Sequence, residues 1–169
     1  MTVPATPARP AAPHRGLTHV DAAGRARMVD VSGKDVTVRE ATARGRVLCS
    51  PQVVSALRGD GVPKGDALAV ARIAGIQGAK RTPDLVPLAH PVAVHSVTVD
   101  LRVADDGVDI TAAVRTADRT GVEMEALTAV CVAGLALVDM VKALDRQARI
   151  TDVRVVAKSG GRSGDWHGE

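Results

Sequence analysis

The clearest pattern along the chain is an alternation of apolar and polar residues over residues 92–103, which returns over residues 108–115. In the first stretch His95 falls in phase with the apolar positions, and this phase favours a structural role for it. Asp105-Asp106-Gly107, between the two stretches, is a typical hairpin turn. Because alternate side chains of a strand face opposite sides, the pattern predicts two antiparallel strands joined by a tight turn.

Helical and extended segments flank this hairpin. Ser50-Pro51 predicts a helix start, with Ser50 as the N-cap and Pro51 at the first helical position. Pro83 and Pro87 break the next helical pattern and predict an irregular loop. In chain order the expected elements are a strand (36–48), a helix (from Ser50-Pro51 to about 59), a helix (65–80), a loop (to 91), the hairpin, a long helix (124–144), a strand (150–157) and a glycine-rich tail.

This order of elements favours one fold class. A strand, two helices, two strands, a helix and a strand match the β-α-β-β-α-β order of the ferredoxin-like type. We therefore predict an α+β fold with a ferredoxin-like antiparallel sheet and helices packed on one face. Prolines at every third position predict a disordered tail over residues 1–16, and a single domain is expected over residues 17–166 with a short tail after it.

Composition narrows the function classes. The 169 residues are 46% hydrophobic, but they include no Phe, no Tyr and only one Trp, Trp166. An RNA-recognition module of this fold stacks bases on sheet aromatics, so RNA binding is disfavoured, and no nucleic-acid partner is expected. The net charge of +3 is a mild excess that suits a small anionic ligand. Isolated Cys49 and Cys131 suit a reducing, cytoplasmic location, and the apolar run over 126–138 is too short to span a membrane.

The long helix carries charges in an otherwise apolar segment. Asp139 and Lys142 are three residues apart and therefore share a face of the helix. Because a buried charge is costly unless it is paired, they are expected to form either a structural ion pair or a proton-transfer pair with a tuned lysine. Glu123 and Glu125 at the other end suit stabilisation of the helix dipole.

Three further segments are candidates for ligand contacts. Lys64 lies on a glycine-flanked loop before a helix, where it either meets an anion or is simply solvated. Lys158 opens a glycine-rich run that includes Arg162; this run suits a phosphate site or a flexible tail. His90 lies on a proline-bounded loop and is a better site candidate than His95. The histidines have no metal-ligand spacing, so no metal site is predicted.

Taken together, five segments resemble one family. The sequences THVDAAGRARMVDVS (18–32), KGDALAVARIAGIQGAKRTPDLVPLAHP (64–91), TGVEMEALTAV (120–130), DMVKA (139–143) and AKSGGRSGDW (157–166) are similar to the MoaC family of cyclic pyranopterin monophosphate synthases, which act in molybdenum cofactor biosynthesis. The resemblance covers residues 17–166 in order and without large gaps.

The resemblance implies an activity and an assembly. Family members are lyases that convert 3′,8-cyclo-7,8-dihydro-GTP to cyclic pyranopterin monophosphate with release of pyrophosphate, and they use no redox cofactor. They are ferredoxin-like homo-hexamers, trimers of dimers, with active sites at subunit interfaces. The alternative is a non-catalytic nucleotide- or RNA-binding module of the same fold.

The resemblance also implies roles for residues. Lys64, Asp139 and Lys142 match catalytic positions, with the lysines as acid or base and the aspartate as their orienter. A further set matches substrate-binding positions: Leu88, Ala89, His90, Glu123, Met124, Glu125, Lys158 and Arg162. The family often has Cys in place of Ala89 and Lys in place of Arg162. A cation is kept at 162, so only the contact geometry changes there.

Overall fold

The alternating stretches pair as predicted. In the computed structural model, which describes residues 18–59, 66–162 and 164–168, β2 (Val94–Val103) and β3 (Gly107–Asp118) form an antiparallel hairpin. Strand β1 (Thr37–Leu48) pairs antiparallel with β3 on one side and with β4 (Arg149–Ser159) on the other. The short strand β5 (Trp166–His167) extends the far edge, so the sheet order is β2-β3-β1-β4-β5. The predicted tail over residues 1–16 lies outside the described residues.

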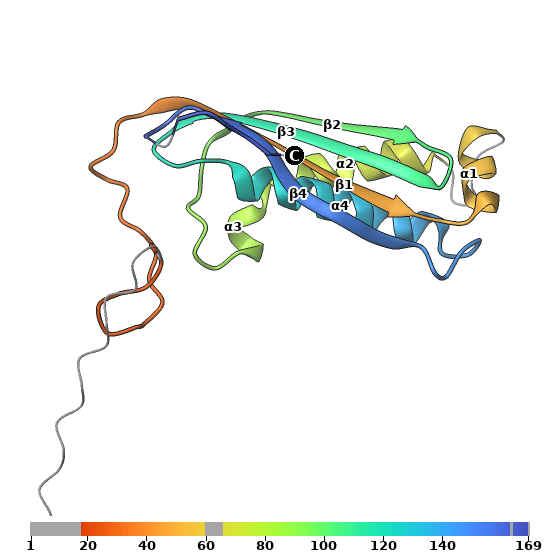
Figure 1. Cartoon of the computed structure of the whole chain (residues 1–169), viewed down its shortest axis with the longest axis horizontal. Helices are drawn as coiled ribbons and strands as arrows, with labels where there is room; N and C mark the ends of the chain where they lie inside the picture. Colours follow the sequence, from red (N-terminus) through yellow and green to blue (C-terminus); the bar gives the residue numbers. More distant parts are fainter. Residues whose placement is uncertain (1–17, 60–65, 163, 169) are drawn as a thin grey trace, which may run out of the picture.

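The two long helices, α2 (Ala67–Lys80) and α4 (Glu123–Val141), cover one face of this sheet. The two short helices are α1 (Pro51–Arg58), beside the hairpin end of the sheet, and α3 (Thr82–Leu85), which packs on α4. Figure 1 shows α2 and α4 lying along the sheet on the same side, and the two helices pack directly against each other. The order β2-β3-β1-β4 with both long helices on one face confirms the predicted α+β, ferredoxin-like fold.

Small residues bring the sheet and helices close together. Ala41, Ala43 and Val47 of β1 are fully buried beneath the helices. Gly45 lies in the same row, and a Cβ placed on it would be only 2.6 Å from a methyl carbon of Val130 in α4. A chain without Phe or Tyr fills its core with short side chains, and the layers must approach closely to leave no voids.

Glycines also allow α2 and α4 to approach each other closely. A Cβ on Gly75 would lie 2.8 Å from the carbonyl oxygen of Ala129, and a Cβ on Gly78 would lie 2.8 Å from Cβ of Val132. Within the described residues, α4 is the one helix long and apolar enough to cross a membrane. It packs instead against α2 and the sheet, which makes it the core helix of the domain.

Three details differ from the sequence-based expectations. His95 lies where the β2–β3 register shifts, so it leaves the apolar row, is exposed, and accepts a 3.4 Å hydrogen bond from the Ala117 N–H through Nδ1. Its predicted place in the apolar row is therefore wrong, whereas its hydrogen bond to β3 agrees with the predicted structural role. The expected loop after α2 contains α3, where Pro83 is tolerated because it lies in the first turn. The expected glycine-rich tail contains β5.

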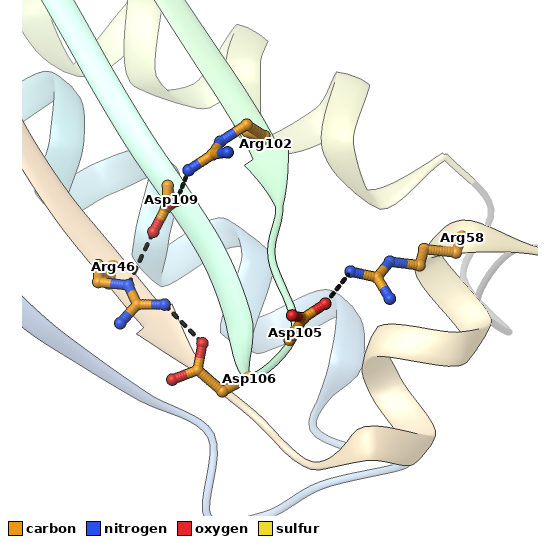
Figure 2. A network of polar contacts seen from close by, with 6 residues as sticks. All are labelled: Arg46, Arg58, Arg102, Asp105, Asp106 and Asp109. Atoms are coloured by element: carbon orange, nitrogen blue, oxygen red, sulfur yellow. Dashed lines mark hydrogen bonds and ion pairs between the residues drawn. The ribbon is translucent and has the colours of Figure 1, made fainter.

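The helix-free face of the sheet is polar, and ion pairs order its β2–β3 turn (Figure 2). Arg46 on β1 binds Asp106 and Asp109 at 2.6 and 2.7 Å, and Asp109 also binds Arg102 at 2.6 Å. These pairs lie at the surface, so each contributes little to stability. Together they fix the hairpin end against β1, at the opposite end of β1 from its first residues.

Candidate active site

Three adjoining pockets lie where β1 and α4 begin. The largest, about 700 Å³, is here called the apolar pocket; it is lined by Val29, Val31, Leu88 and Met124 together with polar groups. The narrow pocket, about 160 Å³, lies beside Lys158 and Ser159, and the arginine pocket, about 370 Å³, lies beside Arg162. Lys34 lines all three pockets, which makes them one groove.

Glu125 is the buried acid of the apolar pocket. It lies in the first turn of α4, with 3% of its surface exposed. Burial raises the pKa of its carboxyl group to about 7, and the nearby Glu123 carboxylate acts in the same direction. A carboxyl group that titrates near neutral pH can both donate and accept a proton at working pH.

His90 ties the apolar pocket to the segment that precedes β1. Its Nε2 lies 2.6 Å from the carbonyl oxygen of Val29. Since a carbonyl only accepts, Nε2 carries the proton and donates this hydrogen bond. The contact holds the loop after α3 against residues 29–31, so both sides of the pocket are fixed relative to each other.

The narrow pocket contains an ion pair that joins α4 to β4. Nζ of Lys158 lies 3.2 Å from Oε1 of Glu123, and both side chains are about 70% covered, with 29% and 28% exposed. The Glu123 carboxylate folds back over Gly121, in space that a Cβ at position 121 would fill. A side chain at position 121 would therefore displace the Glu123 carboxylate from its present position.

The arginine pocket is built around Arg39 of β1. Its Nε donates a 2.9 Å hydrogen bond to the carbonyl oxygen of Asp118, which fixes the guanidinium at the end of the sheet. The guanidinium lies in the space that a Cβ on Gly161 would occupy. Gly161 has φ of +73°, a conformation that suits glycine. Glycine at this position of the β4–β5 turn therefore both allows the turn and leaves space for the Arg39 guanidinium.

The structure gathers most of the residues predicted to bind substrate. Leu88, Ala89, His90, Glu123, Met124 and Glu125 line the apolar pocket, Lys158 lines the narrow pocket and Arg162 lines the arginine pocket. Lys64 lies outside the described residues. Segments more than 60 residues apart in the sequence therefore meet in one groove.

Asp139 and Lys142 do not join this groove within one chain. They pair at 2.6 Å, as their spacing predicted, but the side chains of Asp139 and Lys142 are 55% and 59% exposed rather than buried. Asp139 lies 16 residues after Glu123 on the same helix, a separation of about 24 Å at 1.5 Å per residue. Within the single chain, this helix therefore does not bring the Asp139–Lys142 pair to the groove that contains Glu123.

Two cations of the groove were not predicted from the sequence. Lys34 precedes β1 on an irregular segment, and no local pattern marks it. Arg39 carried a usable signal: it is in phase with Ala41, Ala43 and Val47, so a charged side chain stands in the row that faces the helices. A charged residue in this row, at the end of a strand, could therefore have been predicted to contact a ligand or a partner instead of the core.

Another hollow of similar size, about 740 Å³, lies on the helix-free face of the sheet. Its lining includes two of the ion pairs of Figure 2, Arg46–Asp109 and Arg102–Asp109, so part of its charge is already neutralised inside the chain. Among the described residues, no three His, Cys, Asp or Glu side chains gather as a metal site. The groove beside α4 is thus the better candidate for chemistry.

Comparison with known proteins identifies the family of this chain. The model of the MoaC family matches residues 28–161. Relatives named cyclic pyranopterin monophosphate synthase are 68% identical over 167 residues in Streptomyces avermitilis, with 98% of each chain covered, and 72% identical over 154 residues in Streptomyces coelicolor, with 91% of each covered. A relative of the same name from Nocardioides sp. is 66% identical over 155 residues, which cover 90% of this chain and 95% of the relative. The resemblance seen in the sequence and the prediction of an enzyme are both confirmed, and the chain belongs to the MoaC family.

Proposed function

We propose that this chain is a cyclic pyranopterin monophosphate synthase that converts 3′,8-cyclo-7,8-dihydro-GTP to cyclic pyranopterin monophosphate and releases pyrophosphate. One observation carries the proposal: an apolar pocket with an acid that titrates near pH 7 opens into two pockets lined by cations. That combination suits a ligand with a fused ring system at one end and a triphosphate at the other. The name shared by its relatives supports the same activity.

The ring rearrangement requires several proton transfers. We assign them to Lys64 and Lys142 as acid and base, with Asp139 as the orienter of Lys142. Nζ of Lys142 lies 2.6 Å from Oδ1 of Asp139, so the carboxylate can hold the lysine side chain in place until substrate enters. His90 and Glu125 position the ring system, and Glu125 can also exchange a proton with it because its pKa is raised to about 7.

Closure of the cyclic phosphate is a substitution at the α-phosphorus. A sugar hydroxyl oxygen loses its proton to a base and bonds to the α-phosphorus. The bond from that phosphorus to the bridging oxygen breaks, and its electron pair leaves with pyrophosphate. Lys158, Lys34 and Arg39 can stabilise the negative charge that builds up on the phosphate oxygens.

A homo-hexamer, a trimer of dimers, would bring the two ends of α4 together. The outer stripe of the helical layer is apolar and exposed in one chain: Val70, Ile73 and Leu135 are 43%, 60% and 63% exposed. Such a stripe is typical of a protein interface. We propose that a second copy covers it and brings its own Asp139 and Lys142 to the groove. We further propose a cytoplasmic location.

The alternative, a non-catalytic nucleotide- or RNA-binding module, is less favoured by the site. A binding module would not need the buried acid Glu125 or the Asp139–Lys142 pair for proton transfer. It also lacks a stacking surface, because Trp166 is the one aromatic residue of the chain.

The direct test is to incubate the purified oligomer with 3′,8-cyclo-7,8-dihydro-GTP and to assay pyrophosphate and the pterin product. We expect both products in equal amounts. A folded oligomer that binds the substrate without forming either product would refute the proposed activity and favour the binding module.

A further inference from the structure

Asp139 and Lys142 lie at the C-terminal end of α4, where little of the chain covers them. Their side chains are 55% and 59% exposed, and Lys142 is the C-cap residue of the helix. The last carbonyl groups of a helix have no partners within it, so helix ends fray. The position of the pair therefore depends on what fastens this end of α4 to the rest of the chain.

Asp145 makes that connection. Its N–H donates a 3.1 Å hydrogen bond to the carbonyl oxygen of Val141, the last residue of α4. Its carboxylate accepts hydrogen bonds from two backbone N–H groups, through Oδ2 from Ser50 at 2.7 Å and through Oδ1 from Gln147 at 2.8 Å. One side chain therefore joins the end of α4, the start of α1 and the turn that leads to β4.

Ser50 depends on this contact because its own side chain does not cap α1. It is the N-cap residue, as the sequence predicts, but it makes no side-chain cap bond. Its buried Oγ makes no hydrogen bond with any residue that the structure describes. The partial positive charge of a helix N-terminus favours a nearby carboxylate. Asp145 supplies that carboxylate from 95 residues further along the chain.

The junction between β1 and α1 is itself held in place. The N–H of Cys49 donates a 3.1 Å hydrogen bond to the carbonyl oxygen of Asp106 in the hairpin turn. Arg46 of β1 binds the carboxylate of the same Asp106 at 2.6 Å, as Figure 2 shows. Asp145 thus fastens the end of α4 to an ordered corner of the sheet.

We propose that Asp145 is a positioning residue for the reaction: by accepting the Ser50 N–H, it holds the Asp139–Lys142 pair where the groove of a second copy can use it. This inference rests on the proposed function, in which that pair transfers protons. A displacement of about 1 Å in a catalytic group can lower a rate about a hundredfold. Asp145 touches no substrate in this assignment and acts through the pair.

The two ends of α4 predict how kcat and KM respond. The groove lies beside Glu123 and Glu125 in the first turn of the helix, whereas Asp145 follows its last turn. Loss of the bond to Ser50 should therefore lower kcat and leave KM nearly unchanged. A general loss of packing would not be confined to kcat.

Two variants break this bond from opposite sides. Asp145→Ala removes the acceptor, and Ser50→Pro removes the donor at a residue whose φ of −66° already suits proline. In the full-length oligomer, with 3′,8-cyclo-7,8-dihydro-GTP as substrate, each should lower kcat about tenfold or more and change KM less than about twofold. Neither should lower kcat further in a Lys142→Ala background, because both act through that lysine.

Asp105→Ala is the matched control, because Asp105 binds Arg58 at 2.8 Å and so joins the end of α1 to the hairpin turn and not to α4. It should keep the wild-type kcat. Asp145→Asn retains an amide oxygen that can accept the Ser50 N–H, so it should keep most of the wild-type kcat. Hydrogen exchange followed by mass spectrometry gives a readout without turnover. Exchange over residues 139–145 should be about tenfold faster in Asp145→Ala and Ser50→Pro, and unchanged in Asp105→Ala.

The outcomes separate the role of Asp145 from the proposed activity. If the wild type turns over and both Asp145→Ala and Ser50→Pro keep its kcat, the inference is overturned and the activity stands. A loss of kcat that recurs in full in the Lys142→Ala background would also overturn it, because the effect would then not pass through the pair. If the wild-type oligomer has no turnover, the synthase proposal fails and exchange alone decides. Unchanged exchange in both variants would then show that Asp145 does not hold the end of α4.

Discussion

Lys158 and Glu123 join the last long strand of the sheet to the first turn of the core helix, with Nζ and Oε1 3.2 Å apart. The pair lines the narrow pocket, and Glu123 lines the apolar pocket as well. A phosphate that enters the narrow pocket must share Lys158 with this carboxylate. The pair therefore holds the Lys158 side chain in place before substrate arrives. Less side-chain entropy is then lost when the substrate binds.

Lys158→Ala should raise KM for the cyclised dihydro-GTP about tenfold or more, because a charge-assisted contact to phosphate is lost. The melting temperature should change little, since a partly exposed ion pair contributes about 1 kcal/mol or less. Steady-state kinetics and thermal unfolding measure the two effects. Lys80→Ala, at an exposed position at the end of α2, is the matched control and should leave KM unchanged. Equal KM values in the two variants would remove Lys158 from the substrate site.

Gly161→Ala should impair the groove through Arg39. The new Cβ would take the space of the guanidinium, so the end of the Arg39 side chain must shift from its position beside Asp118. We expect a KM increase close to that of Arg39→Ala, and no further increase when the two changes are combined, because they remove the same contact.

Gly164→Ala is the matched control for backbone strain. Gly164 has φ of +65°, close to the +73° of Gly161, but a Cβ on it would meet nothing within 4 Å. Both variants lose about 1 kcal/mol of stability or more from the left-handed conformation. If Gly164→Ala impairs substrate binding as strongly as Gly161→Ala, backbone strain and not the position of Arg39 explains the effect.

The sequence predicted the fold well because its signals are local. The period of two in β2 and β3, and the unbroken apolar segment of α4, each depend on neighbouring residues only. The groove is different: Arg39 meets Gly161 because β1 pairs with β4, and Lys158 meets Glu123 because α4 crosses the sheet there. These contacts join residues that are 35 or more positions apart, and no short pattern reports them.

Asp139 and Lys142 show a second limit of sequence patterns. The helix is apolar nearly all round, so its charges were expected to be buried, yet both are more than half exposed in one chain. Leu135 on the same helix is 63% exposed. An apolar pattern indicates that a surface is covered, but it does not distinguish cover by the same chain from cover by a second copy.

The buried acid Glu125 should make stability depend on pH. Its pKa is 4.5 in an unfolded chain and about 7 in the folded protein. Between these values only the folded state holds the proton, so the free energy of unfolding is highest below about pH 4.5, falls as pH rises to about 7, and is flat above that. Glu125→Gln should remove this contribution and be at least as stable as the wild type at pH 8.

Chemical denaturation between pH 4.5 and 8.5 measures the effect. Glu40→Gln replaces an exposed carboxylate on β1 and should keep the wild-type curve. In the activity assay, kcat/KM of the wild type should change near pH 7, and Glu125→Gln should lack that change. An unaltered pH curve in Glu125→Gln, for both stability and kcat/KM, would show that Glu125 does not titrate in this range.

The separation of the two ends of α4 predicts complementation between inactive variants. Asp139→Asn and Lys142→Ala should each lower kcat at least about a hundredfold, as expected for general acid–base residues. Glu125→Gln should also lower activity, because it lies in the apolar pocket. If each site takes Glu125 from one subunit and Asp139 from another, random mixing of the Glu125→Gln and Asp139→Asn chains leaves about a quarter of the sites with both native residues. Co-expressed mixed oligomers should then recover up to that share of wild-type activity.

A second mixture provides the control for this experiment. His90 and Glu125 line the same pocket of one chain, so mixing His90→Ala with Glu125→Gln chains never produces a site with both native residues. This mixture should show no recovery, whereas the Glu125→Gln and Asp139→Asn mixture should. Recovery in neither mixture, with mixed oligomers demonstrated by mass spectrometry, would show that Asp139 acts on its own chain or not at all. Because Asp139 lies about 24 Å from Glu123 along α4, that result would exclude it from the groove described here.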